Sequence, residues 1–159
     1  MIRPASLADA PEIAKLWNWM IRDTLATFTT IEKRKTDIQA MIATRVNAFF
    51  VAINKEQLIG FVTFGPFRGG PGYAQTVELS IVVSPEVQGR SIGENLMAHA
   101  ERAAKEDAIH VMVAAISGAN DQAFKFHQKV GFVESGRMPE VGRKSEQWLD
   151  LILMQKILN

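Results

Sequence analysis

Glu78 is a charged residue in an otherwise apolar run, Val77–Val83, where only Ser80 is also polar. A carboxyl group enclosed by apolar side chains has a raised pKa, and such a group can take a proton from a reacting substrate near neutral pH. An ordinary outward-facing position on a strand would produce the same pattern. The residues alone leave Glu78 as a candidate general base or as a solvent-facing strand residue.

The segment 81–93, Ile-Val-Val-Ser-Pro-Glu-Val-Gln-Gly-Arg-Ser-Ile-Gly, passes from an apolar strand through a turn into a helix. A helix N-terminus presents backbone N–H groups without partners and a partial positive charge, which suit a phosphate group. Gly89 and Gly93 permit close approach of a ligand, and Arg90 adds a cation. The segment matches neither a P-loop nor the dinucleotide fingerprint G-x-G-x-x-G. A phosphate site and a plain strand–turn–helix connection both remain open.

The chain contains no cysteine, which excludes disulfides, thiolate metal sites and a cysteine nucleophile. Of the three histidines, His99 and His110 are interpreted as structural. His127 titrates in the range where a side chain can donate a proton near pH 7, although a lone helical histidine is often structural. Asn120 stands at the start of a predicted helix and is expected to be its N-cap, a role compatible with a ligand contact.

Helical and strand patterns alternate along the chain without repeats. Ser6 and Asp9 can cap a first helix, whose apolar face carries Ile13, Trp17 and Ile21. The other predicted helices are 36–46, 89–105 and 120–130, and the predicted strands are 2–5, 49–53, 58–64, 73–83, 109–116, 132–135 and 148–157. This order predicts an α/β fold, a mixed sheet with helices on its faces.

Length and composition limit the classes of protein. A chain of 159 residues, 47% hydrophobic and 22% charged, is typical of one globular domain, taken as residues 1–159. The net charge of +1 disfavours a nucleic-acid binder. No uncharged apolar run approaches the roughly 20 residues of a membrane span, and the N-terminus lacks a signal-peptide layout. A cytoplasmic protein without membrane contact is expected.

Two motifs resemble those of the GCN5-related N-acetyltransferases. The first, Gln88-Gly89-Arg90-Ser91-Ile92-Gly93, is similar to the family's pyrophosphate signature Q/R-x-x-G-x-G/A, with Ser91 in place of the first signature glycine. The second, Asn120-x-x-Ala123 … His127-x-x-x-Gly131-Phe132, resembles the family's later coenzyme motif. The resemblance covers essentially the whole chain and implies one twisted mixed sheet of about six to seven strands with about four helices.

Shorter matches resemble one branch, the phosphinothricin and methionine-sulfoximine acetyltransferases. They are Gly65–Phe67, Thr76–Glu78, His110–Ile116, Met138–Lys144 and Trp148–Leu151. This branch implies acetyl-CoA as co-substrate without a metal, a homodimer, and the primary amine of an amino acid or analogue as acceptor. Direct transfer in a ternary complex fits a chain without cysteine. A protein N-acetyltransferase and a non-catalytic coenzyme A sensor remain as alternatives.

The resemblance also implies roles for individual residues. Glu78 takes the position of the branch's general base, and His127 stands where many relatives carry a tyrosine proposed to protonate the departing thiolate. Backbone groups of Ile81, Val82 and Val83 are expected to pair with the pantetheine amides. Gln88, Gly89, Arg90, Ser91, Ile92 and Gly93 are expected to hold the pyrophosphate, and Asn120 to contact the coenzyme.

The acceptor pocket is the least determined part. Phe28, Phe67 and Tyr73 are large aromatics on predicted loops or loop edges, where they favour a pocket or a dimer contact. Arg68 and Lys144 could hold a carboxylate or phosphinate, or be ordinary surface residues. Methionine-sulfoximine-type relatives usually carry an arginine four residues before the glutamate, and Ala74 stands there instead. Ser145–Gln147 replaces a Phe-Gly-Arg-like stretch, so weaker recognition of a free carboxylate is expected.

Overall fold

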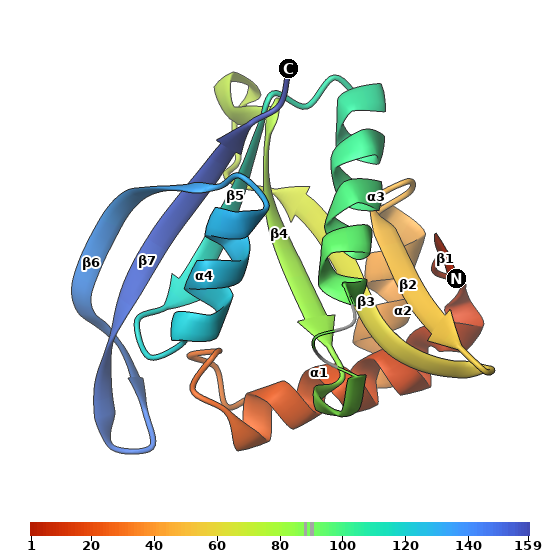
Figure 1. The fold of residues 1–159 in the computed structure, drawn as a ribbon, viewed down its shortest axis with the longest axis horizontal. Helices are drawn as coiled ribbons and strands as arrows, with labels where there is room; N and C mark the ends of the chain where they lie inside the picture. The colour runs from red at the N-terminus through yellow and green to blue at the C-terminus, as the bar shows by residue number, and fades with distance from the viewer. Residues whose placement is uncertain (88, 90) are drawn as a thin grey trace.

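The computed structural model describes residues 1–87, 89 and 91–159. Within them the chain forms one seven-stranded mixed sheet of order β1-β2-β3-β4-β5-β7-β6 (Figure 1). The strands are β1 (Ile2–Pro4), β2 (Phe49–Asn54), β3 (Gln57–Pro66), β4 (Thr76–Val83), β5 (Val111–Ser117), β6 (Val133–Lys144) and β7 (Gln147–Ile157). Neighbouring strands are antiparallel except β4 and β5, which run parallel.

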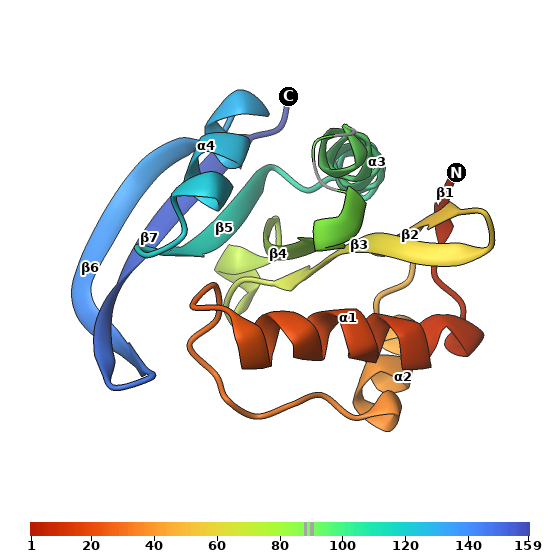
Figure 2. The ribbon, with the colours of Figure 1, turned by 60° about the horizontal axis from the view of Figure 1, so that its bottom comes forward.

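Four α-helices cover the sheet in the described residues, two on each face (Figure 2). They are α1 (Ala10–Asp23), α2 (Lys35–Thr44), α3 (Ile92–Glu106) and α4 (Asp121–Lys129). Helices α1 and α2 lie on one face, and α3 and α4 lie on the other. The fold is thus the single-domain mixed α/β architecture predicted from the sequence. No described helix has the length and apolar character needed to cross a membrane.

Two apolar layers hold these helices to the sheet. On the α1 side, Ile13, Trp17 and Ile21 pack against inward-facing residues of β2 and β3, and the rings of Trp17 and Phe61 lie 4.9 Å apart. On the α3 side, Leu96 and Ala100 are fully buried against the opposite face. Strand β3 is buried from Leu58 to Gly65 because both layers cover it. These layers fix the central strands against which the site is built.

The parallel pair β4–β5 separates partway along its length. The register joins Thr76 to Val111, Val77 to Met112 and Glu78 to Val113, and no further β4–β5 pair forms in the part of the chain described. Beyond Glu78, β4 stays paired with β3, and β5 stays paired with β7 as far as Ser117. Figure 1 shows the two strands diverging toward the bottom of the view. The sheet therefore contains a V-shaped opening whose closed end lies at Glu78.

Several predicted boundaries were wrong. Helix α3 begins at Ile92 rather than at residue 89, because Gly89 and Ser91 have left-handed backbone conformations, with φ of 87° and 59°. Strand β4 begins at Thr76, since residues 71–73 form a short 3-10 turn. Strand β6 extends to Lys144, far beyond the predicted 132–135, because pairing with β7 carries it past Gly136 and Pro139.

Candidate functional site

A cavity of about 630 Å³ opens between the separated strands and the helices that flank them. Its walls come from the end of α1 and the following loop, the open part of β4, the turn before α3 with the first turn of α3, and helix α4. Among the lining residues are Ile81, Val82, Val83, Gly89, Ser91, Ile92, Gly93 and Asn120. All eight are residues for which coenzyme contacts were predicted. The fold brings them to one cavity, although nearly 40 residues separate the first from the last.

The edge of β4 beside this cavity has no strand partner. Because the β4–β5 ladder ends at Glu78, the backbone from Leu79 to Val83 presents its β5-facing N–H and C=O groups to the opening. Unpaired strand groups of this kind bind an extended amide-containing ligand as an added strand would. The predicted pairing of Ile81, Val82 and Val83 with pantetheine amides is consistent with such an edge and stays a prediction.

The first turn of α3 provides the anion-binding part of the cavity. Ser91 is the N-cap residue, and its side chain makes no capping hydrogen bond. Within the described part of the chain, no side chain accepts a hydrogen bond from the first backbone N–H groups of this helix, and such groups suit a phosphate. The site residues Gln88 and Arg90 lie outside the residues that the structure describes.

Gly93 lets α4 approach the start of α3. A Cβ atom at Gly93 would lie 3.0 Å from Cε1 of Phe126, closer than side chains normally pack. One turn further on, Lys129 Nζ of α4 lies 2.5 Å from Glu94 Oε1 of α3. All four residues line the cavity, so the helices on its two sides meet there through one ring contact and one ion pair.

Asn120 is the N-cap of α4, as predicted. Its Oδ1 accepts a hydrogen bond from the Ala123 N–H at 3.0 Å. The amide nitrogen of the same side chain has no part in the cap, and among the described residues it donates no hydrogen bond, so it can serve as a donor on the cavity wall. Capping and ligand contact are therefore compatible at this residue.

His127 is buried, with 4% of its surface exposed, and its ring lies edge-on to the rings of Phe126 and Phe132. Nδ1 lies 2.7 Å from the Ala123 carbonyl oxygen, so Nδ1 carries the proton and donates it there. Nε2 is buried without a hydrogen-bond partner among the described residues. The pKa of the imidazole is lowered, because the effect of burial exceeds the opposite effect of this hydrogen bond. A neutral ring in this tautomer has no proton at Nε2, and the acid role remains a prediction that this geometry disfavours.

Glu78 lies at the closed end of the V, on the face covered by α1 and α2. It is exposed to solvent, yet its desolvation raises the pKa of the carboxyl group, and the positive charge of Arg45 acts in the opposite direction. From Glu78 to Ile81 on the cavity wall is three residues of strand, about 10 Å. Glu78 is thus reachable from the α1–α2 face while the cavity meets the same strand further along.

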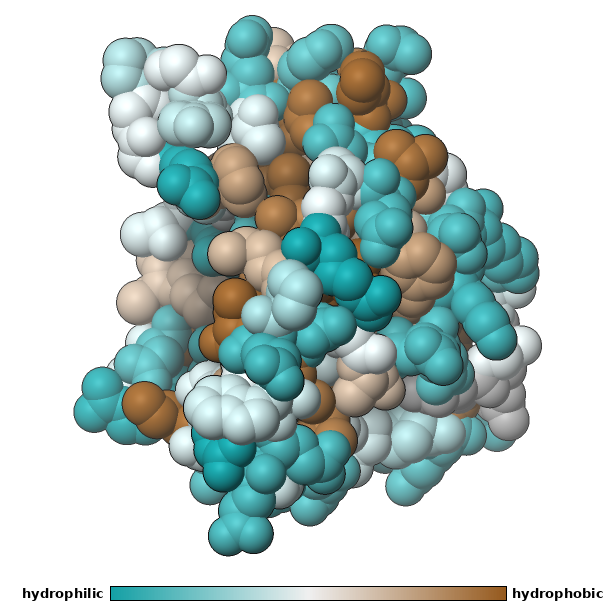
Figure 3. Space-filling view, turned by 90° about the vertical axis from the view of Figure 1, so that its left-hand side faces the viewer, coloured by the Kyte–Doolittle hydropathy of each residue, from teal (hydrophilic) through white to brown (hydrophobic). Residues whose placement is uncertain are grey.

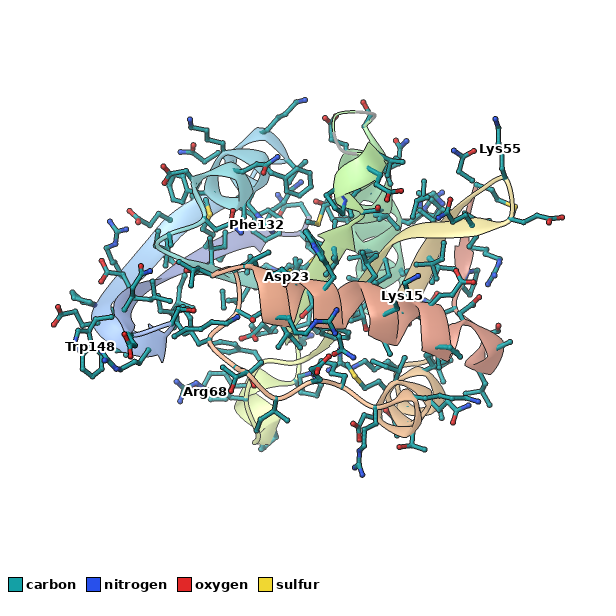
Figure 4. The ribbon with its side chains drawn as sticks, turned by 90° about the horizontal axis from the view of Figure 1, so that it is seen from below. Lys15, Asp23, Lys55, Arg68, Phe132 and Trp148 are labelled. Atoms are coloured by element: carbon teal, nitrogen blue, oxygen red, sulfur yellow. The ribbon has the colours of Figure 1, made fainter. Side chains whose placement is uncertain are left out.

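The predicted acceptor residues form two separate groups. Phe67 and Tyr73 are 6.0 Å apart, with Arg68 stacked over Phe67, on the loop between β3 and β4. Arg68 projects outward there in Figure 4. Phe28 instead packs over Gly142 of β6, and the buried Lys144 donates to Thr27 Oγ1 at 2.9 Å.

The second group joins the α1–α2 loop to the β6–β7 hairpin. Desolvation lowers the pKa of the Lys144 ammonium group, and no ion pair compensates it within the described chain. None of the five predicted acceptor residues lines the cavity between β4 and α4.

Sequence reasoning missed one wall of the cavity. Trp19, Met20, Thr24, Leu25 and Ala26 line it from the end of α1 and the following loop. Trp19 and Met20 lie off the most buried stripe of α1, and this partial exposure of large apolar residues is the signal that could have marked them. No group of three His, Asp or Glu side chains suited to a metal ion occurs in the described ranges.

Comparison with known proteins gives consistent matches. Residues 13–132 match the model of the acetyltransferase (GNAT) family. The chain is 32% identical, over 97% of its length and 92% of the relative's, to the L-methionine sulfoximine/L-methionine sulfone acetyltransferase of Pseudomonas aeruginosa. 

Two solved structures share the fold over nearly the whole chain. One is the phosphinothricin acetyltransferase of Sinorhizobium meliloti in complex with acetyl-CoA, with a TM-score of 0.94 and 28% identity over 100% of this chain and 88% of that one. The other is the ribosomal-protein-alanine N-acetyltransferase of Brucella melitensis, with a TM-score of 0.94 and 33% identity over 99% of both chains.

Proposed function

The chain belongs to the acetyltransferase (GNAT) family, and from this premise we propose that it transfers an acetyl group from acetyl-CoA to the primary amine of an amino acid or amino-acid analogue. The observation that carries the proposal is the cavity at the β4–β5 split. It combines an unpaired strand edge with an uncapped helix N-terminus, and the carboxylate of Glu78 stands on the same strand, three residues before Ile81 of the cavity wall. These are the parts needed to hold a thioester coenzyme and to deprotonate an amine.

The coenzyme would lie along β4. The backbone of Ile81, Val82 and Val83 would pair with the pantetheine amides, and the first turn of α3, with Gly89, Ser91, Ile92 and Gly93, would hold the diphosphate. Asn120 would donate its free amide hydrogens from the facing wall. Gln88 and Arg90 are proposed to contribute to the diphosphate site on the sequence resemblance alone.

Glu78 would act as the general base. The ammonium form of an alkyl amine has a pKa near 10, so a proton must leave before or during attack. The raised pKa of Glu78 makes its carboxylate a better proton acceptor than an ordinary glutamate. The amine nitrogen then forms a bond to the acetyl carbon, the carbon–sulfur bond breaks, and the proton passes to Glu78.

The thiolate that leaves needs little help. An ordinary thiol has a pKa of about 8.5, so its anion is an adequate leaving group near pH 7. We assign His127 chiefly to the cavity wall, where it stands beside Phe126 and packs on the core residue Phe132. We keep the proton-donor role only as an assignment from the resemblance.

Acceptor binding, assembly and location extend the proposal. The predicted acceptor residues are proposed to shape the acceptor side from three places: Phe67, Arg68 and Tyr73 from the β3–β4 loop, Phe28 from the α1–α2 loop, and Lys144 from the end of β6. We also propose a homodimer, because Met138, Val141 and Trp148 of the β6–β7 hairpin are exposed. Figure 3 presents this side of the molecule, where hydrophobic residues appear among hydrophilic ones. A cytoplasmic location stays a prediction from the sequence.

A second acceptor class has a specific observation in its favour. The similarity to a ribosomal-protein-alanine N-acetyltransferase extends over the full chain, so a peptide N-terminus is the alternative acceptor. Against it stands the contact of the α1–α2 loop with the β6–β7 hairpin, through Phe28 on Gly142 and Lys144 on Thr27. This contact narrows the space between the α1–α2 loop and the β6–β7 hairpin, through which a polypeptide would have to reach Glu78.

Thiol release from acetyl-CoA tests these alternatives directly. The purified chain is offered L-amino acids, L-methionine sulfone, phosphinothricin, simple alkyl amines and short peptides. We expect turnover with amino acids or analogues at least 10-fold above that with peptides. Preference for peptides would replace the acceptor assignment. Tight binding of acetyl-CoA without turnover on any amine would contradict the proposed catalysis and favour a sensor.

A further inference from the structure

Arg45 places a cation beside Glu78 that the function proposed above does not use. It is the residue directly after α2, and its side chain reaches over β3 on the α1–α2 face of the sheet. Its guanidinium group donates one hydrogen bond, from Nη1 to Thr63 Oγ1 at 3.1 Å. Because a guanidinium carries five N–H donors, most of its donors have no protein partner among the described residues.

Gly65 makes room for this guanidinium group. A Cβ atom on Gly65 would lie 2.7 Å from Nη2 and 2.9 Å from Cζ of Arg45, so the planar group occupies the place of the missing side chain. Gly65 is the cross-strand partner of Glu78 in the β3–β4 register. Side chains of directly paired residues stand about 5 Å apart on the same face of a sheet, and the guanidinium therefore lies on the flank of Glu78.

Arg45 and Glu78 are near each other but are not an ion pair. No nitrogen of Arg45 comes within 4 Å of a Glu78 oxygen, as both residues are described and no such contact is present. The charge of each nonetheless acts on the other, and burial lowers the pKa of the guanidinium. A half-buried cation with free donors and no carboxylate in contact is a site prepared for an external anion.

We propose that Arg45 binds the carboxylate of the acceptor while the amine of the same molecule faces Glu78. In an α-amino acid the amine nitrogen and a carboxylate oxygen are about 3 Å apart. Because the guanidinium occupies the side-chain place of Gly65, the cross-strand partner of Glu78, one such molecule could reach both groups with hydrogen bonds of about 3 Å at each end. The planar fork of arginine matches a carboxylate with two parallel hydrogen bonds. Arg45 thus provides a cation on the acceptor side, where Ala74 provides none.

This inference rests on the proposed function, and the experiment separates the two. Initial rates are measured with L-methionine sulfone and with its amino alcohol, in which CH₂OH replaces the carboxylate. The readout is the ratio of kcat/KM for the acid to kcat/KM for the alcohol. We expect the wild-type chain to favour the acid and Arg45→Gln to lower this ratio about 10- to 100-fold.

Three further variants locate the effect. Arg45→Lys keeps the charge without the fork and should lower the ratio less than Arg45→Gln. Gly65→Ala leaves Arg45 in place but pushes its guanidinium aside, and it should lower the ratio as well. Arg102→Gln removes an exposed arginine from α3, on the opposite face of the sheet, and should leave the ratio unchanged.

A wild-type chain that acetylates both acceptors equally, or an Arg45→Gln variant that loses both activities equally, would overturn the role of Arg45 and leave the proposed function standing. If the wild-type chain acetylates neither, calorimetry with L-methionine sulfone in the presence of coenzyme A decides. Binding that Arg45→Gln abolishes would retain the carboxylate site while the transfer proposal fails. Binding that is absent, or equal in the two proteins, would overturn the site too.

Discussion

The two sides of strand β4 are built in different ways. Toward α3 and α4, the cavity offers mostly backbone: the unpaired edge beyond Glu78 and the free N–H groups at the start of α3. Toward α1 and α2, the proposed chemistry rests on two single side chains, Glu78 and Arg45. The first side follows from the path of the chain, so many sequences can produce it. The second side changes with one substitution, and this is where acceptor preference can differ between relatives with one fold.

Glu78→Gln should impair catalysis on the side of β4 that faces α1 and α2 and leave coenzyme binding on the other side intact. The amide cannot accept the amine proton, so we expect kcat to fall about 10²- to 10³-fold, with little change in the Kd of acetyl-CoA. In the wild-type chain, activity should fall as the pH drops through the pKa of Glu78, which desolvation holds above its ordinary value of 4.5. This loss on the acid side should disappear in the variant.

Steady-state rates from pH 5 to 9 and calorimetry with acetyl-CoA provide the two measurements. Glu106→Gln, the same change at an exposed residue of α3, is the matched control. Equal rates for Glu78→Gln and wild type at every pH would remove Glu78 from the mechanism.

On the side of β4 that faces α3 and α4, the ionisable group to test is His127. We expect its protonation to change the stability of the fold rather than to contribute a charge to the site. Its pKa in the folded chain lies below the ordinary value of 6.5, so between these two values the unfolded chain binds more protons. The free energy of unfolding should therefore decrease as the pH falls below about 6.5, by at most about 1.4 kcal/mol per pH unit for one group.

Urea unfolding at pH 7.5, 6.5 and 5.5 measures this dependence. His127→Asn retains a donor for the Ala123 carbonyl and does not titrate, so its unfolding free energy should depend less on pH. The same slope in both proteins would assign the pH dependence to other groups.

Ser91→Gly tests whether the start of α3 binds the coenzyme through backbone N–H groups rather than through the Ser91 side chain. A left-handed conformation costs a residue with a Cβ atom about 1–2 kcal/mol, and glycine avoids it. Part of this gain is offset by the greater freedom of glycine in the unfolded chain, which leaves a stabilisation of about 0.5–1 kcal/mol.

Thermal and urea unfolding of Ser91→Gly and Ser91→Ala give the comparison. Alanine keeps the Cβ atom and should give no stabilisation. We expect the glycine variant to bind acetyl-CoA at least as tightly as wild type, since the backbone donors are retained. Weaker binding would mean that the Ser91 hydroxyl contacts the ligand.

Lys129→Ala should have the smallest effect of these variants. It measures how far acetyl-CoA binding at the start of α3 depends on charged side chains. Lys129 pairs with Glu94, which stands in the first turn of α3, where a negative charge opposes anion binding. Without Lys129 we expect the Kd of acetyl-CoA to rise about 2- to 5-fold. Adding Glu94→Gln should restore most of the affinity, and a double variant no better than Lys129→Ala would assign the loss to a direct contact of Lys129.

The side of β4 that faces α3 and α4 could be predicted from the sequence better than the side that faces α1 and α2. The motif 81–93 and the cap at Asn120 are local, because each is defined by residues close together in the chain. The cap is confirmed, and the described motif residues Ile81–Val83, Gly89 and Ser91–Gly93 line one cavity, while their coenzyme contacts stay a prediction. Arg45 is not among the candidate site residues that the sequence indicates. Its approach to Glu78 depends on the β3–β4 register and on a glycine 20 residues away, which no local pattern reveals.

The far end of the sheet shows the same limit. Residues 136–144 contain two glycines and a proline and are mostly exposed, so neither propensity nor alternation indicates a strand there. Pairing with the apolar strand β7 decides their conformation. Likewise, no local pattern in the sequence marks Glu78 and Val113 as the last pair of the β4–β5 ladder.

The strand order makes β1 and β6 the two edge strands, at the margins of the sheet. Strand β1 has three residues and ends in Pro4, and β6 carries Pro139 and register irregularities after Glu134 and Met138. Short, irregular or proline-containing margins are poor templates for another chain to extend the sheet. Fibrillar growth through either margin is therefore discouraged, and self-association has to proceed through side chains on a face of the hairpin.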